Sequence, residues 1–189
     1  MRILYAAIIL LCVTATAAAQ SGGPGTYRFK ETLKFTGSDL VHKAELVIRT
    51  KNFAPSAHKI TYVNAAGRAE PGGRADSAVE KIDGRMPLGV AGELPRQEIV
   101  SVVINFDGAL VTVPSSFYFD CFNPNFDGDH FGTALSDNGK SLLVFMAGGA
   151  EKNLYQIIWI FRKDGQHARF VKNCPTCEFN SVLKFFKKD

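Results

Sequence analysis

The sequence predicts a mainly β protein, an antiparallel β-sandwich or barrel that carries one long loop rich in glycine and proline. Apolar and polar residues alternate over several short segments, as in strands with one buried face. Turn residues separate these segments at short intervals, a spacing typical of sandwiches and barrels. Residues 64–97 contain glycine and proline too densely for a long regular element.

Residues 1–19 have the composition of a secretory signal peptide. Arg2 gives a positive start, residues 3–13 are apolar, and small residues at 17–19 precede the expected cleavage site before Gln20. This order is typical of exported proteins. The apolar core is shorter than the ~20 residues that a membrane-spanning helix needs. We therefore expect a cleaved signal and a periplasmic or extracellular location.

The chain after the signal predicts a short leader and one domain. Residues 20–26 (QSGGPGT) are expected to be flexible because of their glycines, and residues 27–189 are long enough for a single β-rich domain with one core. No second apolar segment could span a bilayer after signal cleavage. The formal charge is +4 and the basic residues are spread along the sequence, so a nucleic-acid partner is not expected.

The first strands are expected at residues 27–35 and 40–48. Both segments alternate with period two, and Gly37-Ser38-Asp39 between them suits a turn, so they predict a hairpin. Residues 58–63 form a shorter strand candidate. Within the 64–97 loop, a short helix at 76–81 is an alternative to irregular structure.

The second half of the chain gives the stronger strand pattern. Residues 99–106 and 109–113 flank Asp107-Gly108, a two-residue hairpin signal. The aromatic segment 116–122 (SFYFDCF) predicts another strand.

Four further elements complete the predicted fold. Residues 142–146 and 154–161 are apolar strands; the latter is nearly continuous in apolar residues, so we expect it to be central and covered on both faces. Asp164-Gly165 turns the chain into residues 166–171. A last strand or short helix is expected at 180–186.

Three cysteines remain after the signal, namely Cys121, Cys174 and Cys177. Because disulfides persist outside the cytoplasm, we expect one bridge from Cys121 to Cys174 or Cys177. Two alternatives stay open. The C-x-x-C spacing of Cys174 and Cys177 is that of thiol-disulfide redox sites, and the three thiolates with a histidine could hold zinc.

Segment 120–130 (DCFNPNFDGDH) suggests a calcium site. Oxygen-bearing side chains recur at alternate positions before a glycine, as in calcium-binding loops, although Ala134 stands where a bidentate carboxylate is expected. The alternative is a polar turn between strands, or His130 as a general base. The candidate ligands are Asn123, Asn125, Asp127, Asp129 and His130.

No established catalytic motif is present. The sequence lacks G-x-S-x-G, H-E-x-x-H and Walker-type loops. His42, His58 and His167 have no carboxylate or cysteine at an informative spacing, and Asp107 suits a turn. These observations favour a non-enzymatic protein.

Five segments between residues 81 and 169 resemble a group of exported bacterial proteins for which no activity is known. The segments are KIDGRMPLG, ELPRQEI, VPSSFYFDCFNPNF, LLVFMAGGAEKNLYQIIWIFRKDG and HARF. The resemblance implies a bacterial envelope location and no particular mechanism.

Taken together, the sequence predicts a non-enzymatic exported β domain that binds a protein partner or a small ligand. The 64–97 loop and the 120–130 turn are the expected contact surfaces, because binding residues concentrate on loops carried by a rigid scaffold. One alternative is a thiol-disulfide or metal-dependent envelope enzyme that uses Cys174 and Cys177, or the cluster at 127–130. The other is a structural envelope protein without a small ligand.

Overall fold

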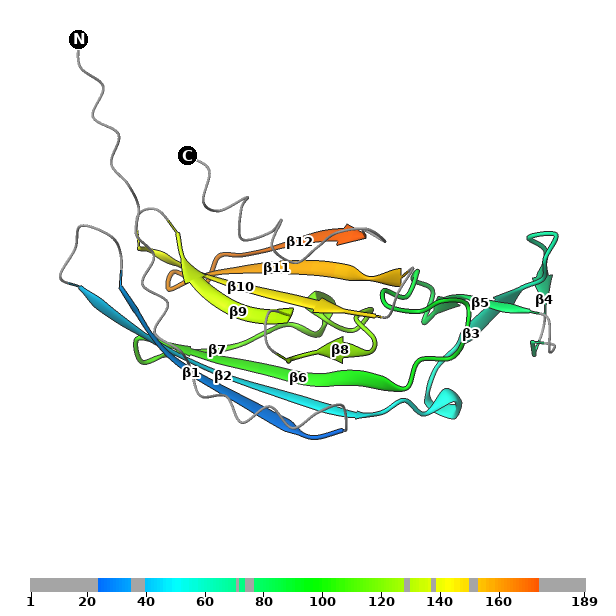
Figure 1. Cartoon of the computed structure of the whole chain (residues 1–189), viewed down its shortest axis with the longest axis horizontal. Coiled ribbons are helices and arrows are strands. Elements are labelled where there is room, and N and C mark those ends of the chain that lie inside the picture. The colour runs from blue at the N-terminus through cyan, green and yellow to red at the C-terminus, as the bar shows by residue number, and fades with distance from the viewer. Residues whose placement is uncertain are drawn as a thin grey trace, which may run out of the picture.

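A computed structural model shows two antiparallel sheets packed face to face and a third, small sheet that projects from one end of the sandwich (Figure 1). The predicted β-sandwich is therefore confirmed, and none of the described sheets closes into a barrel. The structure describes residues 24–34, 40–70, 72–73, 77–127, 130–136, 139–149 and 153–173.

The first sheet has the strand order β1-β2-β6-β7. Its strands are β1 (Thr26–Lys34), β2 (Val41–Asn52), β6 (Gln97–Phe106) and β7 (Ala109–Thr112). The predicted hairpins β1–β2 and β6–β7 are both formed. Their register places Phe29, Leu46 and Ile104 side by side on the buried face, because all three belong to the apolar half of an alternating pattern.

The second sheet has the order β12-β11-β10-β8, with β9 also beside β10. Its strands are β8 (Pro124–Asn125), β9 (Phe131–Leu135), β10 (Ser141–Gly148), β11 (Tyr155–Arg162) and β12 (His167–Asn173). The sequence predicts that segment 154–161 is central, and β11 does lie between β10 and β12. β10 lies between β11 on one side and β8 and β9 on the other, and it is buried along its whole length.

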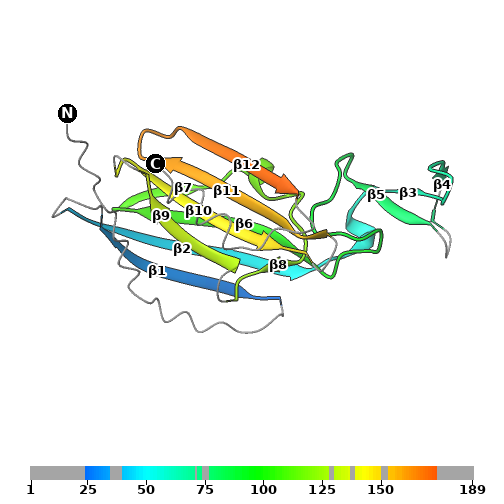
Figure 2. The ribbon, with the colours of Figure 1, turned by 45° about the horizontal axis from the view of Figure 1, so that its top comes forward.

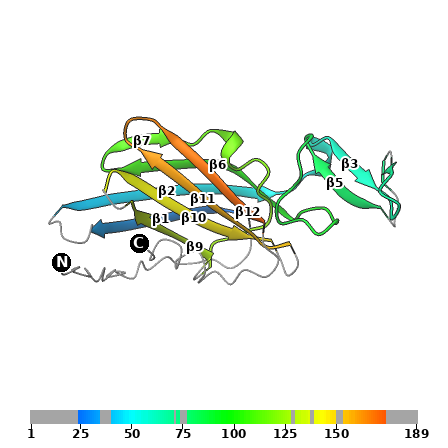
Figure 3. The same ribbon diagram turned by 90° about the horizontal axis from the view of Figure 1, so that it is seen from above.

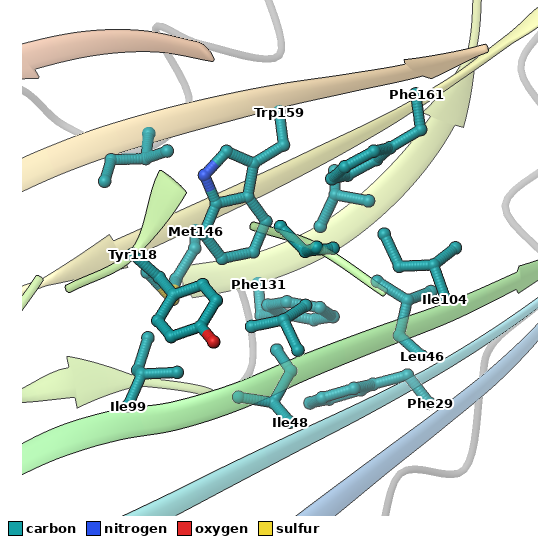
Figure 4. Close-up of a cluster of buried hydrophobic side chains, with 14 of the residues drawn as sticks. Phe29, Leu46, Ile48, Ile99, Ile104, Tyr118, Phe131, Met146, Trp159 and Phe161 are labelled. Carbon is teal, nitrogen blue, oxygen red and sulfur yellow. The ribbon is translucent and has the colours of Figure 1, made fainter. Parts of the chain in front are cut away.

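Large side chains from both sheets fill the space between them (Figure 4). The rings of Phe29 in β1 and Phe131 in β9 stack at 3.9 Å between centroids. Trp159 is fully buried, and its indole nitrogen donates a hydrogen bond to the carbonyl of Phe117 at 3.0 Å. The buried tryptophan thus has the polar partner that its N–H requires.

Residues 53–96 form an excursion between β2 and β6 that we call the arm. It contains the 3-10 turn η1 (Pro55–Ala57) and the sheet β4-β3-β5, made of β3 (Ile60–Val63), β4 (Ala69–Glu70) and β5 (Ala78–Ile82). In all three ribbon views the arm extends beyond the end of the sandwich (Figures 1, 2 and 3).

A small second hydrophobic cluster lies where the arm meets the sandwich; it joins Phe53, Val79 and Ile82 of the arm with Phe122 of the sandwich. The sequence alternative of a helix at 76–81 is wrong, since β5 occupies residues 78–81 of this segment. Val79 and Ile82 of β5 are both buried. A shift in the β3–β5 register falls between them.

The aromatic segment 116–122 is not the strand that the sequence predicted. The backbone N–H groups of Phe117 and Tyr118 bond back to the carbonyls of Pro114 and Ser115, which closes the 3-10 turn η2 (Ser115–Phe117). A strand would direct neighbouring aromatic residues to opposite faces. The turn instead lets them contact the same core.

Several predicted features lie outside the described residues. They are the signal peptide, most of the leader, Cys174, Cys177 and the element at 180–186. In the described part of the chain, no helix is both long enough and apolar enough to cross a membrane.

Candidate functional site

Asp107 organises the turn between β6 and β7. Its Oδ1 accepts the backbone N–H of Lys43 at 2.6 Å, and its Oδ2 lies 2.6 Å from His42 Nδ1 and 2.7 Å from Lys163 Nζ. Partial desolvation opposes ionisation, but the hydrogen bonds from Lys163, His42 and Lys43 outweigh it and lower the pKa of Asp107 to about 2. The carboxylate therefore ties both sheets together at this end of the sandwich.

Asp83 repeats this arrangement at the other end. Its Oδ1 accepts the backbone N–H of Lys59 at 2.9 Å, and its Oδ2 lies 2.7 Å from His58 Nδ1. The hydrogen bonds from His58 and from the Lys59 N–H lower the pKa of the Asp83 carboxyl.

The two turns share sequence as well as geometry. Each aspartate precedes a glycine, has φ of 51°, and donates its own N–H to the carbonyl of the lysine in a His-Lys pair. The two aspartates stand 65 and 25 residues from their histidines. These His-Asp pairs were not predicted from the sequence, although the repeated His-Lys and Asp-Gly dipeptides could have suggested them.

His58 makes a second contact that His42 lacks. Its Nε2 lies 3.0 Å from Glu98 Oε2, close enough for an ion pair though not aligned as a hydrogen bond. Lys51 Nζ lies 3.1 Å from the other oxygen of Glu98, and the His58 ring stacks on Phe53 at 4.6 Å. Because Glu98 belongs to β6 and Asp83 follows β5, His58 anchors the arm to the sandwich.

Asn123, predicted as a calcium ligand, is a second anchor of the arm. Its Oδ1 accepts the backbone N–H groups of Arg96 at 2.8 Å and Gln97 at 3.2 Å, and its Nδ2 donates to the Gly89 carbonyl at 3.0 Å. A calcium ion at this oxygen would have to displace two hydrogen bonds.

The remaining candidate ligands lie beyond Asn123. Asn125 Oδ1 accepts the N–H of Asp127 at 2.9 Å, and the carbonyl of Asp127 receives the N–H and Nδ1 of His130. Asp129 is outside the described residues. Among the side chains that the structure describes, no group of three or more His, Cys, Asp or Glu residues could hold a metal ion.

Cys121 belongs to a buried polar cluster with Asp120, Tyr155 and Arg169. Arg169 Nη2 donates to Asp120 Oδ1 at 2.6 Å, and the Cys121 thiol lies 3.4 Å from the same oxygen. The Tyr155 hydroxyl is buried and has no hydrogen-bond partner among the described groups.

The cluster holds the Cys121 thiol in its protonated form. Burial, and then the charge of Asp120, raise the pKa of the thiol well above its ordinary value, so little reactive thiolate is present. Cys121 is a free thiol in the structure. The predicted partners of Cys121, namely Cys174 and Cys177, both lie outside the described residues. The described part of the chain therefore contains no disulfide to Cys121.

Exposed apolar side chains lie on the arm between β5 and β6. Met86 is 69 % exposed and Leu94 is 41 % exposed. This part of the arm is nevertheless held firmly, since Leu88 donates to the Asp120 carbonyl at 2.8 Å and accepts from the Phe122 N–H at 3.1 Å. The arm thus presents apolar groups on a fixed backbone.

Comparison with protein-family models, with curated proteins and with solved structures finds no match to this chain.

Proposed function

We propose that this chain is a non-enzymatic binding domain, exported from the cytoplasm, that contacts a protein partner through the arm. The observation that carries the proposal is the arm itself, a projecting three-stranded unit inserted between β2 and β6 of the sandwich and packed on it through a small hydrophobic cluster. Most loops between strands are far shorter, and long ordered excursions are usually functional.

The surface chemistry of the arm supports a protein partner. Met86 and Leu94 expose apolar side chains there, and methionine is enriched in the centres of protein interfaces. Exposed charged residues are close to them in the sequence: Arg85 precedes Met86, and Glu93 and Arg96 lie on either side of Leu94. An apolar centre with a polar rim is the usual composition of an interface.

The anchoring of the arm also supports binding. His58 joins Asp83 to Glu98, and Asn123 joins three backbone groups of the 89–97 segment. A surface that is held in place before binding loses less conformational entropy on association. We therefore expect the arm to bind without refolding.

The surroundings of the Cys121 thiol argue against a catalytic role for this residue. A nucleophilic cysteine needs a lowered pKa and access to solvent. Cys121 is 1 % exposed and its pKa is raised by burial, so it has neither property.

Site-specific photocrosslinking tests the proposal in the cell that produces the protein. A photoreactive residue at Met86 or at Leu94 is expected to give the same discrete adduct with one partner, because both positions are exposed on the arm. The matched control is Gln166, which is exposed in the turn between β11 and β12, at the end of the sandwich where Lys163 meets Asp107 and opposite to the arm.

Two results would overturn the proposal. One is the absence of an adduct from both arm positions; the other is an identical set of adducts from the arm and from Gln166. The intact mass of the exported protein tests the location separately, since a chain beginning at Gln20 is expected and an uncleaved chain would contradict export by this signal.

A further inference from the structure

The outer face of the first sheet collects basic side chains from β1 and β2. The alternation that buries Phe29 and Leu46 directs every other residue to solvent. The outward basic residues, all exposed, are Arg28, Lys30, Lys34, Lys43 and Arg49. We call this surface the basic face.

Few negative charges balance the basic face. Glu45, which lies opposite Lys30 with their charged atoms 3.4 Å apart, is the one carboxylate among the outward positions of the described parts of β1 and β2. The basic residues are spread along the sequence, but the antiparallel pairing of two strands brings them onto one surface. Like charges gathered in this way repel one another and attract an anionic partner.

Exposed aliphatic side chains border one end of the same face. Val41 pairs with Lys34 and is 45 % exposed, so it lies at the outward start of β2. Leu110 pairs with Asn105 on the outward side of β7 and is 71 % exposed. Both are at the end of the sheet where the β6–β7 turn lies (Figure 1).

This combination fits a lipid surface better than a soluble polymer. The outward positions of the four strands include no aromatic residue among those described, whereas proteins that bind nucleic-acid strands present aromatic rings for stacking. The charges occupy two neighbouring strands of a sheet face, which matches a two-dimensional array of headgroups. Aliphatic groups beside basic residues are the pattern of interfacial membrane binding.

We propose that the basic face attaches the protein peripherally to a membrane rich in anionic lipids, with Val41 and Leu110 entering the headgroup region. The arm extends from the opposite end of the sandwich (Figures 1 and 3). Attachment through the basic face therefore leaves Met86 and Leu94 open to a protein partner.

Vesicle co-sedimentation tests this attachment with the purified mature chain. Binding is expected to phosphatidylcholine vesicles that contain phosphatidylglycerol, to be weak on pure phosphatidylcholine, and to fall at high salt because the attraction is screened. The variant Arg28→Gln/Lys34→Gln/Lys43→Gln is expected to bind about 100-fold more weakly, from a loss of about fivefold per charge.

The matched control removes the same charge from the arm. Lys59, Arg68 and Lys81 are exposed there, and Lys59→Gln/Arg68→Gln/Lys81→Gln is expected to bind like the wild type. Leu110→Ser leaves the charge unchanged and is expected to weaken binding several-fold. Unchanged melting temperatures would show that every variant is folded.

Three outcomes would overturn the proposal. They are equal loss in the two triple variants, binding that does not depend on phosphatidylglycerol, and binding to soluble polyphosphate without binding to vesicles. The last result would assign the basic face to a soluble polyanion instead of a membrane.

Discussion

Asp107 and Asp83 show how one residue can be both a turn former and an anchor. Each adopts φ of 51° before a glycine, a conformation that aspartate tolerates better than most residues. The same carboxylate then binds a backbone N–H and a histidine from a distant strand. The sequence predicted the turn at Asp107, and the structure adds the long-range contacts.

Replacing Asp107 with asparagine tests the charge at this turn. The folded-state pKa of about 2 lies below the ordinary value of about 3.9, so the stabilisation is complete above about pH 4 and disappears as the pH falls toward 2. Because the carboxylate is partly exposed and screened, Asp107→Asn should lose about 1 kcal/mol of unfolding free energy at neutral pH.

Urea unfolding over a pH series measures this effect, and the loss should vanish at low pH. Asp164→Asn is the matched control, since Asp164 forms an exposed turn pair with Arg162 and should change stability by less than about 0.5 kcal/mol. A loss that persists unchanged to about pH 2 would contradict the electrostatic cause.

Gly89 is a position where the arm approaches the sandwich too closely for a side chain. It has φ of 79°, and a Cβ there would lie 2.5 Å from the Phe122 carbonyl oxygen. Gly84 has φ of 80° but open space around it. We expect Gly84→Ala to cost about 1 kcal/mol from backbone strain alone, and Gly89→Ala to cost at least about 3 kcal/mol from strain and overlap together.

Thermal and urea unfolding of the two glycine variants check this comparison. Equal losses would show that the backbone conformation accounts for the whole effect and that the close approach does not matter.

At the scale of elements, the arm depends on a few contacts with the sandwich. Its buried apolar residues are Phe53, Val79 and Ile82, which pack on Phe122 of the sandwich, and this is a small cluster for a three-stranded sheet. A sheet with so little buried area needs support from outside to be stable. The contacts of His58 with Asp83 and Glu98 give that support.

His58→Ala is therefore expected to loosen the arm selectively. It removes the contact with Asp83 and one of the two partners of the buried Glu98, which then keeps only Lys51, and loss of a partner from a buried charge is costly. Hydrogen exchange in β3 and β5 should accelerate at least about tenfold, while β10 and β11 keep their protection, because local opening need not involve the whole fold.

His42→Ala provides the matched control for the arm. It disrupts the same His-Asp arrangement at the other end of the sandwich, so it should leave exchange in β3 and β5 unchanged. A uniform acceleration over all strands in His58→Ala would contradict a local anchoring role.

At the scale of the whole molecule, the two sheets also meet along one edge. Glu31 in β1 accepts a hydrogen bond from the Thr133 hydroxyl in β9, beside the stacked rings of Phe29 and Phe131. Burial raises the pKa of Glu31, and the bond from Thr133 opposes this only in part. The Glu31 carboxylate therefore joins the two sheets, but its ionised form is destabilised by burial.

Glu31→Gln should stabilise the protein at neutral pH by up to about 1 kcal/mol, because the amide can still accept from Thr133 without a desolvated charge. The raised folded-state pKa favours the protonated acid, so the cost is complete at neutral pH and absent below the unfolded value of about 4.3.

Urea unfolding at neutral pH and at about pH 4 should thus show a gain only at neutral pH. Glu45→Gln, on the outward side of β2 beside Lys30, should show no such gain. Destabilisation by Glu31→Gln at neutral pH would mean that the charge itself holds the edge together.

The sequence by itself determined the fold class, most strand positions and the β1–β2 and β6–β7 hairpins. These features depend on local alternation and turn residues, which act over a few neighbouring positions. Segments 27–35 and 99–106 therefore agreed closely with β1 and β6. Segment 116–122 did not agree with the predicted strand. Its aromatic residues pack into the core between the two sheets, and this packing overrides the local preference for a strand.

Only the tertiary structure decided which distant residues meet. The pairing of His58 with Asp83 and Glu98, the use of the Asn123 amide to hold the arm, and the free thiol of Cys121 beside Arg169 all depend on where separate strands come to lie. The basic face has the same origin, since Lys34 and Lys43 become neighbours through strand register alone. Register is set by burial of the opposite face, so the surface chemistry of this protein is a consequence of how its core packs.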